Sequence, residues 1–274
     1  MFIGYNLKLN QDDFIGSVMS YDWYTHEGRN LFNKYEKKFN AKLEEFTING
    51  RIDGSKLQEN WFPEIEADIF LSHSHQDEDL AITLAGYLHY HYGLTIFIDS
   101  CFWGYSNNLL RAIDNKYSKS PTGDSYNYDK RNYSTSHVHM MLSSALQKMI
   151  DNTECLIFLN TENSLSSLTD DIEDKTMSPW IYMELIASKI TRRTRKREIY
   201  LYEEKSLPQV FSYEESKILQ VEYKVDITHL LPLNPSTLLN LKEISHICSL
   251  DRLYSQTVSP MDFSHIYSES KLIK

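Results

Sequence analysis

The run Trp180-Ile-Tyr-Met-Glu184 places an indole and a carboxylate four residues apart in a helical pattern. Side chains at positions i and i+4 lie on the same face of a helix, one turn apart. A lone Glu is usually a solvated surface group, but here Trp180 and Met183 would share its face. Apolar surroundings raise the pKa of a carboxyl group, and carboxyls of that kind concentrate at catalytic sites. Glu184 is therefore the first candidate for a catalytic residue.

Three histidine pairs resemble metal-ligand pairs, but their spacing argues against a metal site. They are His73-x-His75, His89-x-His91 and His137-x-His139. On a helix, positions i and i+2 point about 200° apart, so the second and third pairs cannot hold one ion. The first pair falls in an expected loop, where no nearby Cys or third His completes a zinc site. We therefore expect no metal.

Other catalytic and nucleotide-binding motifs are missing from the sequence. Ser72, His73 and Asp99 offer the residue types of a Ser-His-Asp hydrolase, but there is no G-x-S-x-G motif and the chain order is not the usual one. Neither G-x-G-x-x-G nor G-x-x-x-x-G-K-[ST] occurs. Their absence argues against a Rossmann dinucleotide site and against a P-loop.

Short apolar runs alternate with helical patterns in the middle of the chain. We expect strands at 67–71, 94–98, 155–159 and 198–202, and helices at 80–91, 107–117, 141–150 and from Pro179 onward. Ser178 before Pro179 is typical of a helix start. This alternation predicts an α/β fold with a parallel sheet covered on both faces. The ligand site of such a sheet lies at the carboxyl ends of its strands, where the segments 72–76, 99–106 and 160–177 should gather.

The two ends of the chain depart from this pattern. Residues 1–65 are expected to form a mostly helical accessory segment, in which Asn49-Gly50 is a signal for a small hairpin. Residues 66–204 form the expected main domain, with a polar excursion at 118–136. Residues 205–274 form a C-terminal addition to it.

The composition favours a cytoplasmic globular protein. Hydrophobic residues make up 41% of the chain, and the net charge of −10 repels nucleic acid and anionic membranes. The one dense basic run, 191–197, is expected to be a solvated helix end. Three cysteines, odd in number and far apart, favour a reducing compartment. No signal peptide is visible, and the apolar runs are too short to span a membrane.

Several segments together resemble a TIR (Toll/interleukin-1 receptor) domain. The stretch Ala67-Asp-Ile-Phe-Leu-Ser-His-Ser-His-Gln-Asp-Glu-Asp79 is similar to the first strand of that family and the loop after it. Ile96-Phe-Ile-Asp99, followed by Trp103-Gly104, is similar to the second strand and the BB loop. Leu156-Ile-Phe-Leu-Asn160, a Ser-rich loop and Ser178-Pro-Trp-Ile-Tyr-Met-Glu-Leu185 resemble the later strand and the W-x-x-x-E helix. The resemblance covers residues 66–204, half of the chain.

This resemblance implies a flavodoxin-like sheet and, in the enzymatic branch of the family, cleavage of the bond between nicotinamide and ribose in NAD. It implies that Glu184 is the catalytic carboxylate and that Trp180 is its aromatic neighbour. It also implies two groups of substrate-binding residues. Those along the nucleotide are Ser72, His73 and Ser74, and those in a mobile loop beside it are Asp99, Trp103 and Gly104. NAD is the substrate, and no separate cofactor is implied.

The resemblance further implies a homo-oligomer and a role in prokaryotic antiviral defence. The enzyme would either deplete NAD or make a nucleotide signal for a separate effector protein. Water attack would give ADP-ribose and attack by the adenine base a cyclic product, and the sequence leaves both open. Two alternatives remain: a non-catalytic TIR-like adaptor that acts by protein contacts, and a nucleoside deoxyribosyltransferase-like enzyme, which also uses a Glu beside an N-glycosidic bond.

Overall fold

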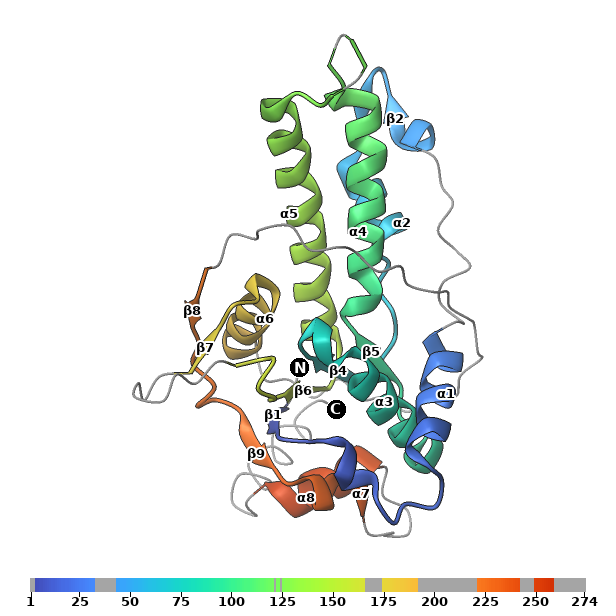
Figure 1. Ribbon diagram of the computed structural model, residues 1–274, viewed down its shortest axis with the longest axis vertical. Helices are drawn as coiled ribbons and strands as arrows, with labels where there is room; N and C mark the ends of the chain where they lie inside the picture. The colour runs from blue at the N-terminus through green and yellow to red at the C-terminus, as the bar shows by residue number, and fades with distance from the viewer. Residues whose placement is uncertain are drawn as a thin grey trace, which may run out of the picture.

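A five-stranded parallel sheet forms the centre of the computed structural model (Figure 1). The structure describes residues 3–32, 43–120, 122–123, 125–165, 174–191, 221–241 and 249–258. The strands lie in the order β5-β4-β6-β1-β9. They are β5 (Ile96–Ile98), β4 (Ile69–Ser72), β6 (Cys155–Leu159), β1 (Ile3–Leu7) and β9 (Leu231–Leu233). The strands expected at 67–71, 94–98 and 155–159 are confirmed, as is the α/β class.

Helices cover both faces of this sheet, because its strands are apolar on both sides. Ile69 and Leu71 of β4 belong to one core, whereas Phe70 between them belongs to the other. The first core is shared with α1 (Tyr21–Phe32), α3 (Glu78–Tyr92), α7 (Pro235–Leu239) and α8 (Ser249–Thr257). The second is shared with α2 (Gly54–Trp61), α4 (Ser100–Ile113), α5 (Tyr128–Asn152) and α6 (Pro179–Ile190).

The strand β1 comes from the segment that we expected to be accessory. It lies between β6 and β9, with Ile3 opposite Cys155 and Leu7 opposite Leu233. The sheet therefore takes strands from all three of the expected segments, 1–65, 66–204 and 205–274. A flavodoxin-like sheet has its strands in the order 2-1-3-4-5. Strands β5, β4 and β6 correspond to the first three places of that order, 2-1-3, and the next place, beside β6, would belong to a strand later in the chain. That position belongs to β1, and the strand expected at 198–202 lies outside the described residues.

Helix α1 packs tightly on α3 through two glycines. A Cβ atom at Gly28 would lie 2.1 Å from the Ile82 carbonyl oxygen, and one at Gly86 would lie 2.1 Å from the Tyr24 carbonyl oxygen. The helices can approach so closely only because glycine has no side chain. Helix α3 ends before Gly93, which has a φ of 65°, as its sequence pattern predicted.

Helices α4 and α5 stand side by side as an arm that extends beyond the sheet (Figure 1). Two expectations are wrong here. The loop expected at 99–106 is helical from Ser100, because one glycine costs a helix only about 1 kcal/mol and does not break it. The second half of the polar excursion, 128–136, is the start of α5, and the Asn127 side chain caps this helix by accepting a hydrogen bond from the Lys130 backbone N–H. A two-helix arm has little core, so its helices remain polar in sequence.

The remaining elements are short. The Asn49-Gly50 turn joins β2 (Thr47–Ile48) to β3 (Arg51–Ile52) in an antiparallel hairpin, as expected, with positive φ at both residues. A second pair consists of β7 (Lys175–Thr176) and β8 (Tyr223–Lys224). Single turns are η1 (Gln11–Phe14), η3 (Leu43–Phe46), η4 (His75–Asp77) and η5 (Asp114–Ser118). Among the described residues, no helix has the length and apolar character needed to cross a membrane.

Candidate functional site

Four buried polar residues meet where β4 and β5 end. Ser72 is the last residue of β4, His73 follows it, and Asp99 follows β5. Glu184 reaches them from the middle of α6. Their exposed fractions are 0% for Ser72 and Glu184, 3% for His73 and 1% for Asp99. In the sheet, β5 lies on one side of β4, and β6, the next strand of this part of the chain, lies on the other side. Ligand sites of open α/β sheets form where the strand order reverses in this way, and the cluster lies beside that point.

The start of α6 explains why Glu184 points toward the sheet. The Ser178 hydroxyl accepts a hydrogen bond of 3.2 Å from the Ile181 backbone N–H, and Pro179 begins the helix, as the sequence predicted. From that start, Ile181, Glu184 and Leu185 fall on the buried face at i, i+3 and i+4. The carboxyl group therefore lies on the buried face of α6, between Ile181 and Leu185 of the second core.

Ser72 is the hydrogen-bond partner of Glu184. Its hydroxyl donates to Glu184 Oε2 over 2.6 Å, while Glu184 Oε1 has no hydrogen-bond partner among the described residues. Burial raises the pKa of Glu184 well above its usual value, and the charge of Asp99 raises it further. The Ser72 hydroxyl opposes both effects and lowers this pKa. Burial and the charge of Asp99 therefore both favour the protonated form of Glu184.

His73 and Asp99 form a buried ion pair. His73 Nδ1 lies 2.9 Å from Asp99 Oδ1 and 3.4 Å from the Leu71 carbonyl oxygen, so this nitrogen carries a proton. The contact with Asp99 is not aligned as a hydrogen bond. Burial lowers the pKa of His73, but the nearby carboxylate of Asp99 and the contact with the Leu71 carbonyl oxygen raise it more, so the net shift is upward. His73 Nε2 has no partner in the described part of the chain.

The loops after β4 and β6 meet at the same edge of the sheet, as expected. Asp77 accepts hydrogen bonds from the Thr161 hydroxyl and from Asn163 Nδ2, the latter over 2.8 Å. Residues 166–173 of the predicted rim segment lie outside the described residues. Asp77, Thr161 and Asn163 were not predicted individually as site residues, although all three are polar and follow strand ends.

The other expected site residues show no contact with the four-residue cluster among the described side chains. Trp180 is half-buried, and its ring contacts His139 of α5 edge-on, with centroids 5.6 Å apart. Ser74 caps η4 by accepting a hydrogen bond from the Gln76 backbone N–H. Trp103 and Gly104 belong to α4, so the expected mobile loop is wrong, and the side chain of Trp103 is not among those described.

The hydrolase arrangement weighed from the sequence does not form. The Ser72 hydroxyl donates to Glu184, whereas His73 pairs with Asp99.

No protein-family model matches the chain, and neither does a curated protein or a solved structure. In the described part of the chain, no three His, Cys, Asp or Glu side chains gather as metal ligands. The arrangement is thus a buried acid–base cluster, in which a carboxyl group with a raised pKa lies beside a His–Asp pair.

Proposed function

We propose that the chain is a TIR-type enzyme that cleaves the bond between nicotinamide and ribose in NAD, with Glu184 as the catalytic residue. The observation that carries this proposal is the buried contact between Ser72 and Glu184 at the carboxyl end of β4. It brings together two residues that lie 112 positions apart in the sequence and that the TIR resemblance assigns to one substrate site. A carboxyl group with a raised pKa in that position is a recognised mark of a functional site.

The chemistry suits an ionised Glu184. Nicotinamide leaves NAD as a neutral molecule, so the leaving group needs no proton from an acid. The ribose that remains is oxocarbenium-like and positively charged, and a nearby carboxylate stabilises that charge. The pyridinium ring of bound NAD would lower the pKa of Glu184, because an opposite charge favours the ionised carboxylate. Substrate binding would therefore convert the resting acid into the catalytic carboxylate.

Access to Glu184 requires the surrounding elements to separate, since its exposed fraction is 0%. Asp99 directly precedes α4 and Ser72 ends β4, so these two elements hold members of the cluster. We include self-association in the proposal, as the resemblance implies, with assembly favouring the open site. The product would be ADP-ribose or its cyclic form, acting by NAD depletion or as a signal for a separate effector protein in antiviral defence.

Full burial also favours one alternative, a non-catalytic adaptor in which the same cluster only stabilises the fold. Nicotinamide release from NAD by concentrated purified protein separates the two functions. Wild type should release nicotinamide, and Glu184→Ala should lower the rate by about a hundredfold or more. Glu59→Ala, an exposed glutamate on α2, serves as the matched control and should leave the rate unchanged.

Chromatography of the products completes the experiment. A second peak of ADP-ribose indicates hydrolysis, and a cyclic product indicates cyclisation. Parallel reactions with deoxynucleosides test the deoxyribosyltransferase alternative, which predicts base exchange there and no cleavage of NAD. If concentrated wild type releases no nicotinamide, or if the Glu184→Ala protein releases it at the wild-type rate, the proposal is wrong and the adaptor becomes the better account.

A further inference from the structure

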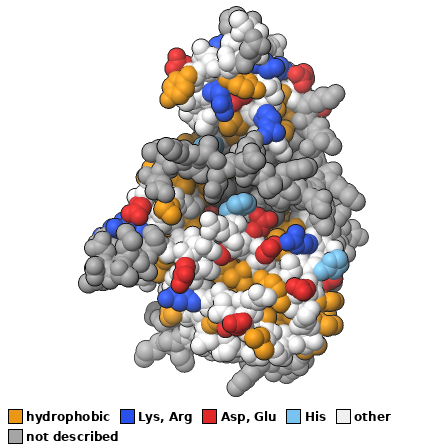
Figure 2. Space-filling view, viewed as in Figure 1, with side chains coloured by type: hydrophobic (Ala, Val, Ile, Leu, Met, Phe, Trp, Pro, Cys, Tyr) orange, Lys and Arg blue, Asp and Glu red, His pale blue; other side chains and the backbone are white. Residues whose placement is uncertain are grey.

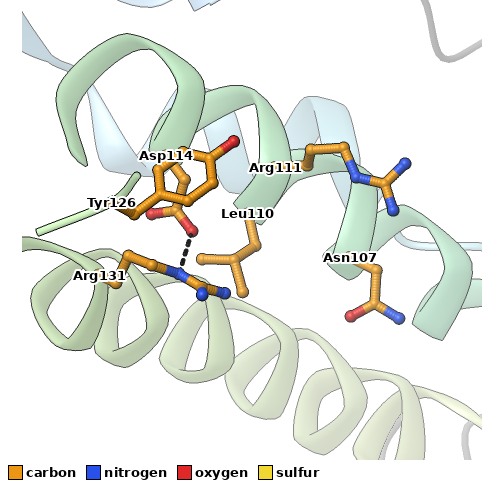
Figure 3. A pocket seen from close by; sticks show the side chains of 6 residues that line it. All are labelled: Asn107, Leu110, Arg111, Asp114, Tyr126 and Arg131. Carbon is orange, nitrogen blue, oxygen red and sulfur yellow. Dashed lines mark hydrogen bonds and ion pairs between the residues drawn. The ribbon is translucent and has the colours of Figure 1, made fainter. Parts of the chain in front are cut away.

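Polar side chains outside the four-residue cluster gather on the arm and at the carboxyl edge of the sheet. On the arm they line a cavity of about 410 Å³ between α4 and α5 (Figure 3). Arg131 Nε donates a hydrogen bond of 3.0 Å to Asp114 Oδ2, so these two charges neutralise each other, and Asp114 Oδ1 is buried. The cavity therefore offers a ligand little that could hold it. The edge of the sheet is different, because its polar contacts adjoin the proposed site of NAD cleavage.

At that edge, Asp77 joins the loops that follow β4 and β6. The Thr161 hydroxyl donates a hydrogen bond to Asp77 Oδ2, and Asn163 Nδ2 donates one of 2.8 Å to Asp77 Oδ1. The two strands are direct neighbours in the sheet, so the loops meet where the strands end. Hydrogen bonds to a carboxylate are stronger than those between neutral groups. Asp77 therefore ties one loop to the other with both of its oxygens.

The loop after β6 is itself held to its own strand. Thr161 Oγ1 accepts hydrogen bonds of 3.2 Å from the backbone N–H groups of Asn163 and Ser164. The Ser164 hydroxyl donates to the carbonyl oxygen of Leu159, the last residue of β6, over 2.8 Å. The partners of Asp77 are thus fixed in place, and they can serve as its anchor.

Between Ser72 and Asp77 the chain forms a short arch, residues 72–77. The Asp77 backbone N–H donates to the Ser74 carbonyl oxygen over 2.8 Å, and the Gln76 N–H donates to the Ser74 hydroxyl over 3.4 Å. The arch carries His73 and Ser74, which the TIR resemblance assigns to NAD binding. The sheet fixes its first end at Ser72, and Asp77 fixes its second end. Side chains on a segment held at both ends keep a defined position.

The charge of Asp77 argues against direct contact with NAD. It is followed by Glu78 and Asp79, which begin α3. In the view of Figures 1 and 2 the start of α3 lies near the middle of the molecule, and the surface there has acidic side chains beside a histidine. Such a surface repels the negative diphosphate of NAD. Any effect of Asp77 on NAD would therefore act through the arch.

We propose that Asp77 is a positioning residue for NAD, which holds His73 and Ser74 in place by tying the arch to the loop after β6. This role rests on the proposed function, because it concerns the binding of NAD at that site. Loss of the tie should release the second end of the arch and so weaken NAD binding. The chemical step should be almost unaffected, since Ser72 stays within β4 and keeps its contact with Glu184.

Two measurements on the full chain test this role. Calorimetric titration of NAD into Glu184→Gln, with and without Asp77→Asn, measures binding without turnover, and initial rates of nicotinamide release by wild type and Asp77→Asn separate KM from kcat. Asp77→Asn removes a negative charge, so it would tighten NAD binding if charge alone mattered. Positioning predicts the opposite, because the new amide NH2 faces one of the two donors. NAD binding should weaken about tenfold, with a matching rise in KM and kcat within about twofold.

Glu162→Gln is the matched control, since Glu162 is an exposed carboxylate between Thr161 and Asn163. It removes the same charge but leaves the tie, so NAD should bind as to wild type or slightly more tightly. Asn163→Ala breaks one of the two hydrogen bonds to Asp77 and should weaken NAD binding about threefold. Added to Asp77→Asn, it should cause less than this further loss, because the two residues act in one contact.

A role of Asp77 in stability alone would lower the amount of active protein, so the apparent kcat would fall while KM stayed unchanged. That result would overturn the positioning role, as would an Asp77→Asn protein that binds NAD as tightly as wild type does. If wild type releases nicotinamide and Asp77→Asn matches it in KM, only the role of Asp77 falls. If wild type neither binds NAD nor releases nicotinamide, the proposed function falls as well.

Discussion

The hydroxyl of Ser72 donates a hydrogen bond of 2.6 Å to Glu184 Oε2 and so connects the end of β4 to the middle of α6. Both residues are fully buried, and Asp99 lies close enough for its charge to raise the pKa of Glu184 further. A buried carboxyl group with a raised pKa beside a buried His–Asp pair is an unfavourable arrangement for stability alone. Such arrangements are expected where function requires them.

We predict that Ser72→Ala lowers the free energy of unfolding by about 1–3 kcal/mol, because it leaves a buried carboxyl oxygen without a partner. The variant also removes the one hydrogen bond that lowers the pKa of Glu184, so this pKa should rise further. Urea denaturation measures the first effect. Ser136→Ala, at an exposed serine on α5, should change the free energy by less than about 0.5 kcal/mol. Equal effects from the two variants would contradict the prediction.

Glu184→Gln should stabilise the protein at neutral pH. The pKa of Glu184 is raised in the folded state above its usual 4.5, so above pH 4.5 the unfolded chain loses a proton that the folded chain keeps. Stability from this group therefore falls as pH rises from 4.5 toward the folded pKa. Glutamine does not titrate, so the variant avoids this loss of stability at higher pH. The difference in stability between the variant and wild type should therefore vanish near pH 4. Thermal unfolding of both proteins between pH 4 and 8 checks this, and a difference that does not depend on pH would contradict it.

His73→Gln should destabilise the protein, most strongly at low pH. The pKa of His73 in the folded state is raised above 6.5, so the stability that its protonation contributes is fully present below pH 6.5 and is lost as pH rises through the folded pKa. Below pH 6.5 the variant should lose about 3–5 kcal/mol, the cost of removing one partner of a buried ion pair. The loss should shrink at higher pH. Chemical denaturation at several pH values measures it, and a loss that grows with pH would count against the assignment.

Gly86→Ala should destabilise the contact between α1 and α3. Its Cβ would lie 2.1 Å from the Tyr24 carbonyl oxygen, so the helices must separate, at a cost of about 1–3 kcal/mol. Gly54→Ala is the control, because its Cβ would meet only Met141 Cε at an ordinary 3.5 Å. That variant should be neutral or stabilising by up to about 1 kcal/mol. Guanidinium denaturation of both proteins compares them directly, and a Gly86→Ala protein as stable as wild type would show that the helices do not pack as described.

The strands around the site could be predicted because each is a short, unbroken apolar run. Strand β1 could not, since Gly4 and Asn6 interrupt its pattern, and only pairing with β6 and β9 makes it a strand. The arm was missed for a related reason. The first turns of α5 bury only Ser134, which bonds to Ser118, so no apolar periodicity marks them.

Part of the candidate site could be predicted in the same way. Ser72, His73 and Asp99 follow two neighbouring parallel strands, so the rule for strand ends brings them together. Glu184 joins them from the buried face of α6, which the Ser178-Pro179 start made predictable. The pairing could not be predicted, because it depends on side-chain directions: Ser72 bonds to Glu184, His73 pairs with Asp99, and Trp180 turns toward His139.

The most direct test measures nicotinamide release from NAD and the free energy of unfolding on the same preparations of wild type and Glu184→Gln at pH 7. The variant keeps the shape of the side chain and its acceptor for Ser72, but it cannot become a carboxylate. A catalytic Glu184 predicts that the variant is more stable than wild type and that its rate is lower by about a hundredfold or more. A variant that releases nicotinamide at the wild-type rate would contradict the catalytic role of Glu184.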